Sequence, residues 1–328
     1  MSTVPTFAGS TTGGGETMVM NSRQRATLAA LCPSVRWEVS MASHSTFRAG
    51  GVVEAMVEPV DSTQLAALLR WLHGEGVAWR AIGGGSNILV TSRYHEGVFI
   101  RLRGSVHDLR TEPASPGDPE GTRVAVEAGC SLAAFVSWCA GQGLRGLECL
   151  AGIPGSVGGA IRMNAGAFDH AIGEALHSLF CISEHGEARE MRQQEISFAY
   201  RTTRLPGEPG QRWLICRSTF LLQRADQQTL TARCREIIAR RREKQPAGVG
   251  SAGSFFKNPE GDYAGRLIEQ AGLKGLTRGG AMVSPTHANF IVNTGGAEPE
   301  DIIALMQEVR ERVLTSCGVL LEPEVHIL

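Results

Sequence analysis

Two glycine-rich stretches decide the fold of this chain: Ile82-Gly-Gly-Gly-Ser-Asn-Ile-Leu-Val90 and Gly152-Ile-Pro-Gly-Ser-Val-Gly-Gly159. The chain holds 40 glycines in 328 residues, about 12%, whereas globular proteins average about 7%. No Gly-X-Y repeat runs through the sequence, which excludes a collagen-like structure. The excess glycine therefore serves particular backbone positions of a folded protein, and these two stretches are where it gathers.

The first stretch follows an apolar run at residues 77–82, as phosphate-binding turns follow a strand. Glycine lets backbone N–H groups approach an anion without interference from a Cβ atom. The stretch is not a dinucleotide fingerprint, because Ile88 occupies the third glycine position, and no Gly-Lys-Ser/Thr follows to make a Walker loop. A tight turn between two strands would explain one such stretch. Two of them, about 70 residues apart, predict two loops that close on one extended, phosphate-bearing ligand.

Helices and strands are mixed without strict βαβ alternation, which indicates an α+β fold. Asp61 caps a helical run with a leucine-rich apolar face. Long helices are predicted at Gln227–Lys244 and at Pro299–Cys317, where Gly318 is the stop signal. The other expected elements are strands at 77–82, 88–90, 98–102, 124–126, 176–182, 188–191, 213–222 and 289–292, helices at 132–140 and 263–271, and a polar loop at 111–122.

The same pattern divides the chain into three parts. Residues 1–22 are glycine-rich and predict a flexible tail, residues 23–225 form the main body, and residues 226–328 form a C-terminal part. We expect the body to split near residue 105 into two subdomains. The last stretch, about 319–328, either stays with the C-terminal part or returns to the body as a strand.

Charge and cysteine content exclude several classes of function. Lys and Arg number 32 and Asp and Glu 33, so neither nucleic acid nor an anionic membrane is an expected partner. No apolar run reaches the roughly 18 residues of a membrane span, and no export signal precedes the body. The eight cysteines include no Cys-x-x-Cys pair, so we expect reduced thiols in a cytoplasmic protein, and no metal site. We expect a monomer.

The order of seven motifs resembles the UDP-N-acetylenolpyruvoylglucosamine reductase family over about residues 40–328. The motifs are Thr46-Phe-Arg-Ala-Gly-Gly51, Ile82-Gly-Gly-Gly-Ser-Asn-Ile-Leu-Val90, Gly146-Leu-Glu-x-Leu-Ala-Gly-Ile-Pro-Gly-Ser-Val-Gly-Gly-Ala160, Met163-Asn-Ala-Gly-Ala167, Tyr200-Arg201, Gly253-Ser-Phe-Phe-Lys-Asn-Pro259 and Glu324-Val325. The resemblance implies an FAD-binding domain of the vanillyl-alcohol-oxidase (PCMH) type, in two α+β subdomains at 23–225. It further implies a smaller α+β substrate-binding domain at 226–328.

The resemblance also implies the chemistry. NADPH would reduce FAD, and FAD N5 would pass the hydride to the enolpyruvyl methylene carbon of UDP-N-acetylglucosamine enolpyruvate, giving UDP-N-acetylmuramate for bacterial peptidoglycan synthesis. Negative charge develops on the adjacent carbon and its carboxylate, which calls for a cation and an acid. The motifs assign Arg201 to the carboxylate, Ser254 to delivery of the proton, and a protonated Glu324 to hydrogen-bonding the enolate. FAD would be non-covalent, because the Gly83 stretch contains no His or Cys.

Each of these three residues has a plain structural alternative. Arg201 looks like other surface arginines, and Ser254 suits an ordinary loop or a helix N-cap. Glu322 lies two residues before Glu324, and a strand would place both on one face. Residue chemistry alone therefore leaves Glu322 and Glu324 open, and the motif match favours Glu324.

The motif positions imply further contacts. The implied cofactor site consists of Arg48, Gly83, Gly84, Gly85, Ser86, Asn87, Gly152, Ile153, Gly155, Ser156, Gly158 and Gly159. The implied UDP-sugar contacts are Lys244, Lys257, Asn258 and Lys274. The chain resembles the shorter branch of the family, since it lacks the extra segments that another branch carries between Arg201 and Ser254 and after Pro259, one of them with a tyrosine that covers the substrate.

Two other functions fit the same residues. One is a different FAD oxidoreductase of this fold, for example an oxidase acting on an alcohol. The other is a nucleotide-binding module without catalysis. The module predicts that Arg201, Ser254 and Glu324 lie scattered, whereas the reductase requires them within a side chain's reach of one point.

Overall fold

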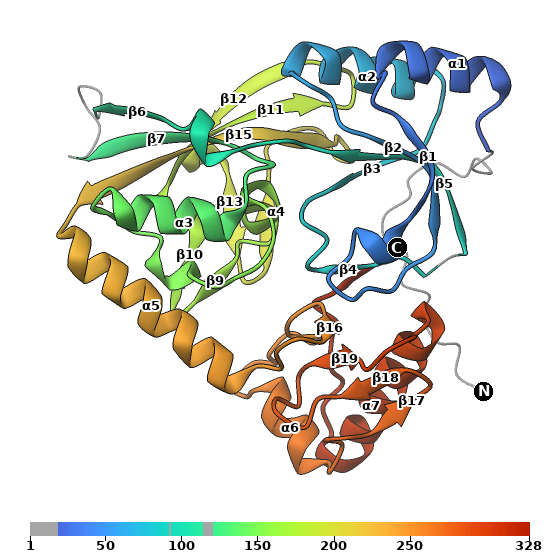
Figure 1. Ribbon diagram of the computed structural model, residues 1–328, viewed down its shortest axis with the longest axis vertical. Helices are drawn as coiled ribbons and strands as arrows, with labels where there is room; N and C mark the ends of the chain where they lie inside the picture. Colours follow the sequence, from blue (N-terminus) through green and yellow to red (C-terminus); the bar gives the residue numbers. More distant parts are fainter. Residues whose placement is uncertain (1–18, 92, 114–120) are drawn as a thin grey trace.

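The computed structural model describes residues 19–91, 93–113 and 121–328, and Figure 1 shows two sheets side by side with a smaller C-terminal unit below them. One sheet mixes parallel and antiparallel pairs, and the sheets of the other two units are antiparallel. The α+β class predicted from the order of elements is confirmed. Within the described residues, no helix has the length and apolar character needed to cross a membrane.

The first unit is a four-stranded sheet with α1 (Ser22–Leu31) and α2 (Ser62–Gly74). In spatial order its strands are β1 (Arg36–Ser40), β2 (Val52–Val57), β5 (Tyr94–Arg101) and β3 (Trp79–Ile82). Strand β5 pairs in parallel with both β2 and β3, which is possible because α2 carries the chain back between β2 and β3. The Asp61 carboxylate accepts the N–H of Gln64 at 2.8 Å, so α2 begins where the cap predicted it.

The first described residues pack into this unit. Met20 is only 4% exposed, and its N–H donates to the buried carboxylate of Glu54 at 2.8 Å. The same carboxylate accepts the N–H of Gly97 at 3.0 Å and pairs with Arg25 at 3.4 Å. The expected tail of residues 1–22 is therefore too long at its C-terminal end, because Met20 and α1 belong to the folded unit. Residues 1–18 lie outside the described residues.

The second unit is a six-stranded antiparallel sheet. Its strands are, in spatial order, β12 (Ala188–Arg192), β11 (Leu176–Ser183), β15 (Trp213–Arg224), β7 (Thr122–Glu127) and β6 (Arg110–Pro113), with β8 (Leu144–Arg145) also pairing with β15. The polar loop expected at 111–122 is wrong at both ends, because β6 and Thr122 pair across the sheet. Residues 114–120 of that loop lie outside the described residues.

Helices α3 (Leu132–Gly141), α4 (Val157–Arg162) and α5 (Gln227–Lys244) pack with this second sheet. Helix α5 has the predicted bounds, but it buries Leu230, Cys234 and Ile237 in the core of the second unit. The boundary expected at residue 226 is therefore too early by the length of this helix. Packing places the start of the C-terminal unit after α5.

The C-terminal unit is a small antiparallel sheet with α6 (Ala264–Gln270) and α7 (Pro299–Cys317). Its strands are β16 (Gly250–Ser251), β19 (Ile291–Asn293), β18 (Ala281–Val283) and β17 (Thr277–Arg278). Helix α7 ends as predicted, because Gly318 takes a left-handed φ of 72° and its N–H donates to the Leu314 carbonyl at 2.9 Å. Phe47 and Leu89 of the first unit share this core, so the two units are joined.

The end of the chain crosses back to the first unit. Strand β20 (His326–Ile327) pairs in parallel with β4 (Ile88–Leu89), near the end of the first glycine stretch. The N–H of His326 donates to the Asn87 carbonyl at 3.0 Å. Residues 319–325 contain only an isolated bridge at Pro323, so the strand expected over about 319–328 is much shorter.

Candidate active site

The two glycine stretches lie against each other. A Cβ atom added to Gly84 would be 2.9 Å from the Cα of Gly155, and one added to Gly83 would be 2.5 Å from the Oγ of Ser156. The Ser86 hydroxyl donates to the Pro154 carbonyl at 3.2 Å. Two loops about 70 residues apart in sequence therefore form one surface, and only glycine permits their close approach.

The first loop offers free backbone donors. Its Gly85 carbonyl accepts the N–H of Thr46 at 2.9 Å, and a side chain on Gly85 would collide with the His44 carbonyl. The N–H groups of Gly83, Gly84 and Ser86 have no hydrogen-bond partner among the described residues. Unpaired N–H groups in a glycine loop form a concavity that binds anions.

A cavity of about 220 Å³ lies beside Gly83 and Gly84. It is also lined by residues 43–46 and by Arg101, whose guanidinium is 3.9 Å from the nearest Glu58 oxygen. No sequence motif marks Arg101, because it ends an ordinary apolar strand. Unpaired N–H groups and a nearby arginine suit the phosphates of a dinucleotide, so the residues present fit an FAD diphosphate.

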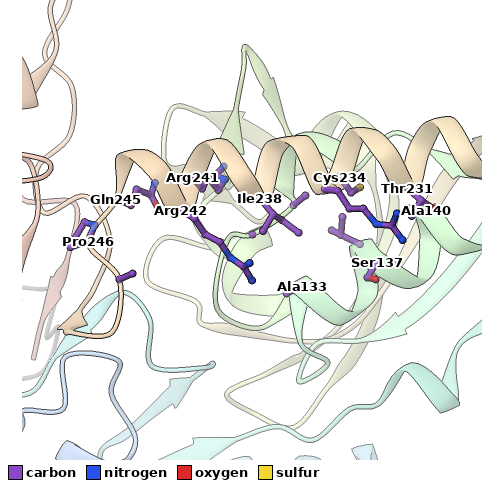
Figure 2. A pocket seen from close by; sticks show the side chains of 15 residues that line it. Ala133, Ser137, Ala140, Thr231, Cys234, Ile238, Arg241, Arg242, Gln245 and Pro246 are labelled. Atoms are coloured by element: carbon purple, nitrogen blue, oxygen red, sulfur yellow. The ribbon is translucent and has the colours of Figure 1, made fainter.

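A larger cavity of about 520 Å³ lies between α3 and α5 and reaches the second glycine stretch at Gly152 (Figure 2). Ile238 and Cys234 contribute apolar surface, and Arg235, Arg241 and Arg242 contribute cationic groups. Figure 2 shows side chains from both helices turned toward the space between them. A cavity with an apolar wall and cationic groups suits a ligand that carries both an aromatic part and an anionic part.

Arg241 is a second cavity residue that lies outside the sequence motifs. Its Nε is buried and has no hydrogen-bond partner in the described part of the chain, and burial lowers its pKa. A signal for it exists, because Arg241 follows Cys234 and Ile237 at helical spacing and so shares their apolar face. An arginine on an apolar face with an unpaired nitrogen is a candidate ligand contact.

Arg201 stands at the tip of a hairpin. Strands β13 (Ser197–Ala199) and β14 (Thr202–Arg204) pair so that Tyr200 and Arg201 form a two-residue turn, and Arg201 has a left-handed φ of 55°. The hairpin rests on the second unit, since Arg162 donates to the Thr203 carbonyl at 2.8 Å. This hydrogen bond holds the hairpin against the second unit and so fixes the position of the Arg201 backbone.

The Arg201 side chain bridges to the end of the chain. Its Nε donates to the Glu324 carboxylate at 2.7 Å, and the two side chains are 22% and 15% exposed. Burial raises the pKa of Glu324 above its usual value, and the nearby Arg201 charge opposes this shift. Glu322 differs from Glu324, because it is 69% exposed and pairs with Lys257 at 3.3 Å. The expectation that both acids share one face of a strand is therefore wrong.

Ser254 lies on the segment next to Glu324. The N–H of Glu324 donates to the carbonyl of Phe255 at 2.8 Å, and the N–H of Phe255 donates to the Asn289 carbonyl at 2.7 Å. Ser254 itself is partly buried. The structure thus brings Arg201 and Glu324 into contact and places Ser254 one residue from the backbone that holds Glu324.

The other expected site residues differ in their surroundings. Asn258 lies near Arg201, because its N–H donates to the Tyr200 hydroxyl at 3.4 Å. Lys274 pairs with Glu269 at 2.7 Å. Lys244 and Arg48 are exposed, at the end of α5 and near the Gly85 loop respectively. The ion pair with Glu269 gives Lys274 a structural role within the C-terminal unit.

Known proteins define the class of this site. A family model described as an FAD binding domain matches residues 53–192, which contain both glycine stretches. The chain therefore contains an FAD-binding domain, and the paired glycine loops belong to it.

More specific comparisons extend along the chain. A family model described as UDP-N-acetylenolpyruvoylglucosamine reductase, C-terminal domain, matches residues 245–328. UDP-N-acetylenolpyruvoylglucosamine reductases of Heliobacterium modesticaldum and Alkalilimnicola ehrlichii are 39% and 41% identical over 88% and 89% of this chain and 88% and 93% of their own. The crystal structure of the Thermus caldophilus reductase has a TM-score of 0.73 at 33% identity and covers 89% of this chain and 99% of its own. The chain belongs to the UDP-N-acetylenolpyruvoylglucosamine reductase family, as the motifs implied.

Proposed function

We propose that this chain reduces UDP-N-acetylglucosamine enolpyruvate to UDP-N-acetylmuramate for peptidoglycan synthesis, with bound FAD and with NADPH as hydride source. FAD supplies the redox chemistry when bound. The observation that carries the proposal is the Arg201–Glu324 pair, which joins the flavin-binding part to the C-terminal part beside Ser254. The names of the relatives support the substrate, and the motif resemblance supports NADPH.

Gly83, Gly84 and Ser86 would hold the FAD diphosphate through their unpaired N–H groups. The other residues proposed for this cofactor site are Arg48, Gly85, Asn87, Gly152, Ile153, Gly155, Ser156, Gly158 and Gly159. At Gly85 and Gly158, close packing alone explains why the residue is glycine. A Cβ on Gly158 would lie 2.7 Å from the Cβ of Ala128, and one on Gly85 would strike His44. These two glycines shape the loops, and the free N–H groups contact the ligand.

Arg201 and Glu324 would bind the enolpyruvyl carboxylate together. The Nε of Arg201 donates to Glu324, and its Nη1 donates to the Gly166 carbonyl at 3.5 Å, so Nη2 is the guanidinium nitrogen that would bind the substrate carboxylate. A protonated Glu324 can donate a hydrogen bond to the same group, and its raised pKa favours that form. The two residues would stabilise the negative charge that develops beside the carboxylate.

Ser254 would deliver the proton to the carbon next to the carboxylate. A serine hydroxyl is a weak acid, and it becomes effective when a strongly basic carbanion is held against it. Its loop is fixed on both sides of Phe255 by backbone hydrogen bonds to Asn289 and Glu324. This gives Ser254 a defined position relative to the carboxylate-binding pair.

Lys244, Lys257, Asn258 and Lys274 are proposed contacts of the UDP-sugar. Lys244 is exposed beside the arginines of α5, and Lys257 must exchange its exposed partner Glu322 for a phosphate. The Asn258 side chain already accepts the N–H of Ala264 at 3.1 Å. Lys244 and Lys257 are therefore the stronger candidates for the diphosphate of the substrate.

A two-step absorbance experiment tests the proposal. The purified flavoprotein is mixed with NADPH without oxygen, which should bleach the visible absorbance of the oxidised flavin. Addition of the enolpyruvyl UDP-sugar should restore it. Bleaching by an alcohol but not by NADPH would assign an alcohol oxidase instead. Failure of any reductant or substrate to change a bound flavin would favour a non-catalytic binding module.

A further inference from the structure

Tyr200 is a large aromatic residue at the junction of the two units, and it is 53% exposed. It occupies the turn of the β13–β14 hairpin immediately before Arg201. Its hydroxyl accepts the N–H of Asn258 at 3.4 Å. Its ring centre lies 4.9 Å from the guanidinium carbon of Arg201. Tyr200 therefore touches both the hairpin that carries Arg201 and the loop that carries Ser254.

The partner of the hydroxyl lies at the end of a loop that its own unit anchors at Phe255, Phe256 and Lys257. Residues 254–258 are held at Phe255 by Glu324 and Asn289, and at Lys257 by the Glu322 carbonyl at 2.9 Å. Asn258 follows, and its side chain caps the start of α6 at Ala264. The Tyr200 hydroxyl is thus the contact through which the hairpin of the second unit reaches this loop.

The ring has a separate effect on Arg201. A guanidinium within about 6 Å of an aromatic face is attracted to it, which limits its orientations. Arg201 is already held by Glu324 through Nε. The ring, the Glu324 carboxylate and the Gly166 carbonyl, which accepts from Nη1 at 3.5 Å, together restrict the orientation of the guanidinium.

We propose that Tyr200 is a positioning residue that clamps the Ser254 loop onto the β13–β14 hairpin, so that Arg201 and Ser254 act on the same substrate molecule. Its hydroxyl fixes the loop through Asn258, and its ring fixes the guanidinium of Arg201. The inference rests on the proposed function. Tyr200 acts through these two residues and not on the substrate itself.

The test compares Tyr200→Phe, which removes only the hydroxyl, with Tyr200→Leu, which also removes the ring. Each flavoprotein is reduced with dithionite and mixed with the enolpyruvyl UDP-sugar in a stopped-flow instrument. Recovery of the flavin absorbance should slow about fivefold in Tyr200→Phe, the effect of one lost neutral hydrogen bond. It should slow about 20-fold in Tyr200→Leu, because the cation–π contact is lost as well.

Two further readouts separate positioning from a general structural effect. In Tyr200→Phe the dissociation constant for the sugar, from the flavin difference spectrum, should stay within about twofold of wild type, because one exposed hydroxyl is removed. The solvent deuterium isotope effect on recovery should rise, since a misplaced Ser254 makes proton transfer slower. Tyr94→Phe is the matched control, because Tyr94 is an exposed tyrosine of the first unit, away from the proposed site.

The outcomes are distinct. If the flavin absorbance of the wild-type protein does not recover when the sugar is added, the proposed function is wrong, and the clamp fails with it. Normal wild-type recovery with an unchanged rate and isotope effect in Tyr200→Phe would overturn the clamp. Equal slowing in Tyr200→Phe and Tyr94→Phe, with equal loss of thermal stability, would also overturn it, since any lost tyrosine hydroxyl would then suffice.

Discussion

Replacing Glu324 by glutamine removes one titrating carboxyl from the proposed site and keeps the shape of the side chain. Glu324 is 15% exposed, and its Oε1 lies 2.7 Å from the Nε of Arg201. Burial raises the pKa of Glu324, with Arg201 acting in the opposite direction. A carboxylic acid donates a hydrogen bond only below its pKa. The contribution of Glu324 as a donor should therefore be complete at low pH and lost as the pH rises through that value.

The expected kinetic result has two parts. In Glu324→Gln, the rate at which the enolpyruvyl UDP-sugar reoxidises the flavin should fall about tenfold at slightly acidic pH, because an amide is a weaker donor than a carboxylic acid by about 1.4 kcal/mol. The wild-type rate should decline as the pH rises through the raised pKa of Glu324, and the variant rate should lack this decline. Anaerobic stopped-flow absorbance at several pH values measures both.

Glu322→Gln is the matched control, because it makes the same change two residues earlier. Glu322 is 69% exposed and pairs with Lys257, so its loss should change the rate by less than about twofold. If Glu324→Gln keeps the wild-type decline with pH, protonation of Glu324 does not control the reaction. If Glu322→Gln removes the decline instead, the role belongs to Glu322.

The same substitution has a defined effect on stability. A carboxyl with a raised folded-state pKa binds its proton more tightly in the folded protein than in the unfolded chain. Its contribution to stability is present below the ordinary glutamate pKa and is lost as the pH rises through the folded-state value. The free energy of unfolding of Glu324→Gln, measured with urea, should therefore gain relative to wild type as the pH increases. A constant difference across pH would contradict the direction of the pKa shift.

Three further predictions concern the loops and the scaffold. Gly84→Ala should lower the flavin content of the purified protein at least about tenfold, because the new Cβ would lie 2.9 Å from the Cα of Gly155 and separate the loops. Gly74→Ala is the control: its Cβ would have no atom within 4 Å, and this variant should bind flavin normally. Ser254→Ala should leave flavin bleaching by NADPH nearly intact and slow reoxidation by the sugar about 100-fold, the scale of one general acid, and equal loss in both steps would rule out a proton donor. Asp61→Ala should lower the free energy of unfolding by about 1 kcal/mol in urea, since it removes the α2 cap, with both flavin half-reactions unchanged.

The parts of the fold that the sequence predicted well depend on local signals. Helix α2 starts at the Asp61 cap and α7 ends at Gly318, and each of these signals acts within about one helical turn. The contact between the two glycine stretches was also predictable, because their composition allowed a close approach that other residues forbid. These inferences needed no knowledge of the tertiary structure.

The parts that could not be predicted depend on contacts between distant segments. The unit to which α5 belongs is set by the burial of Cys234 against residues from 124 onward, which no local pattern reveals. Glu322 and Glu324 are alike in sequence and become different only because the Phe255 carbonyl holds the backbone of Glu324 beside Arg201. The helical spacing of Arg241 predicts that it lies on the apolar face of α5. Its unpaired Nε depends on how Gly152 packs against it, which the spacing does not show.

The backbone of Arg201 adds an argument for its role that its side chain alone does not give. By residue type it matches Arg204 at the end of β14, but Arg201 lies in the turn before that strand and has a φ of 55°, a conformation that costs a non-glycine residue roughly 1–2 kcal/mol. Glycine would occupy this turn position without that strain. The Glu324 ion pair and the Tyr200 ring contact offset part of the cost, and both also restrict the orientation of the guanidinium. A strained turn held by the same contacts that orient a cation is what a pre-organised anion-binding site requires.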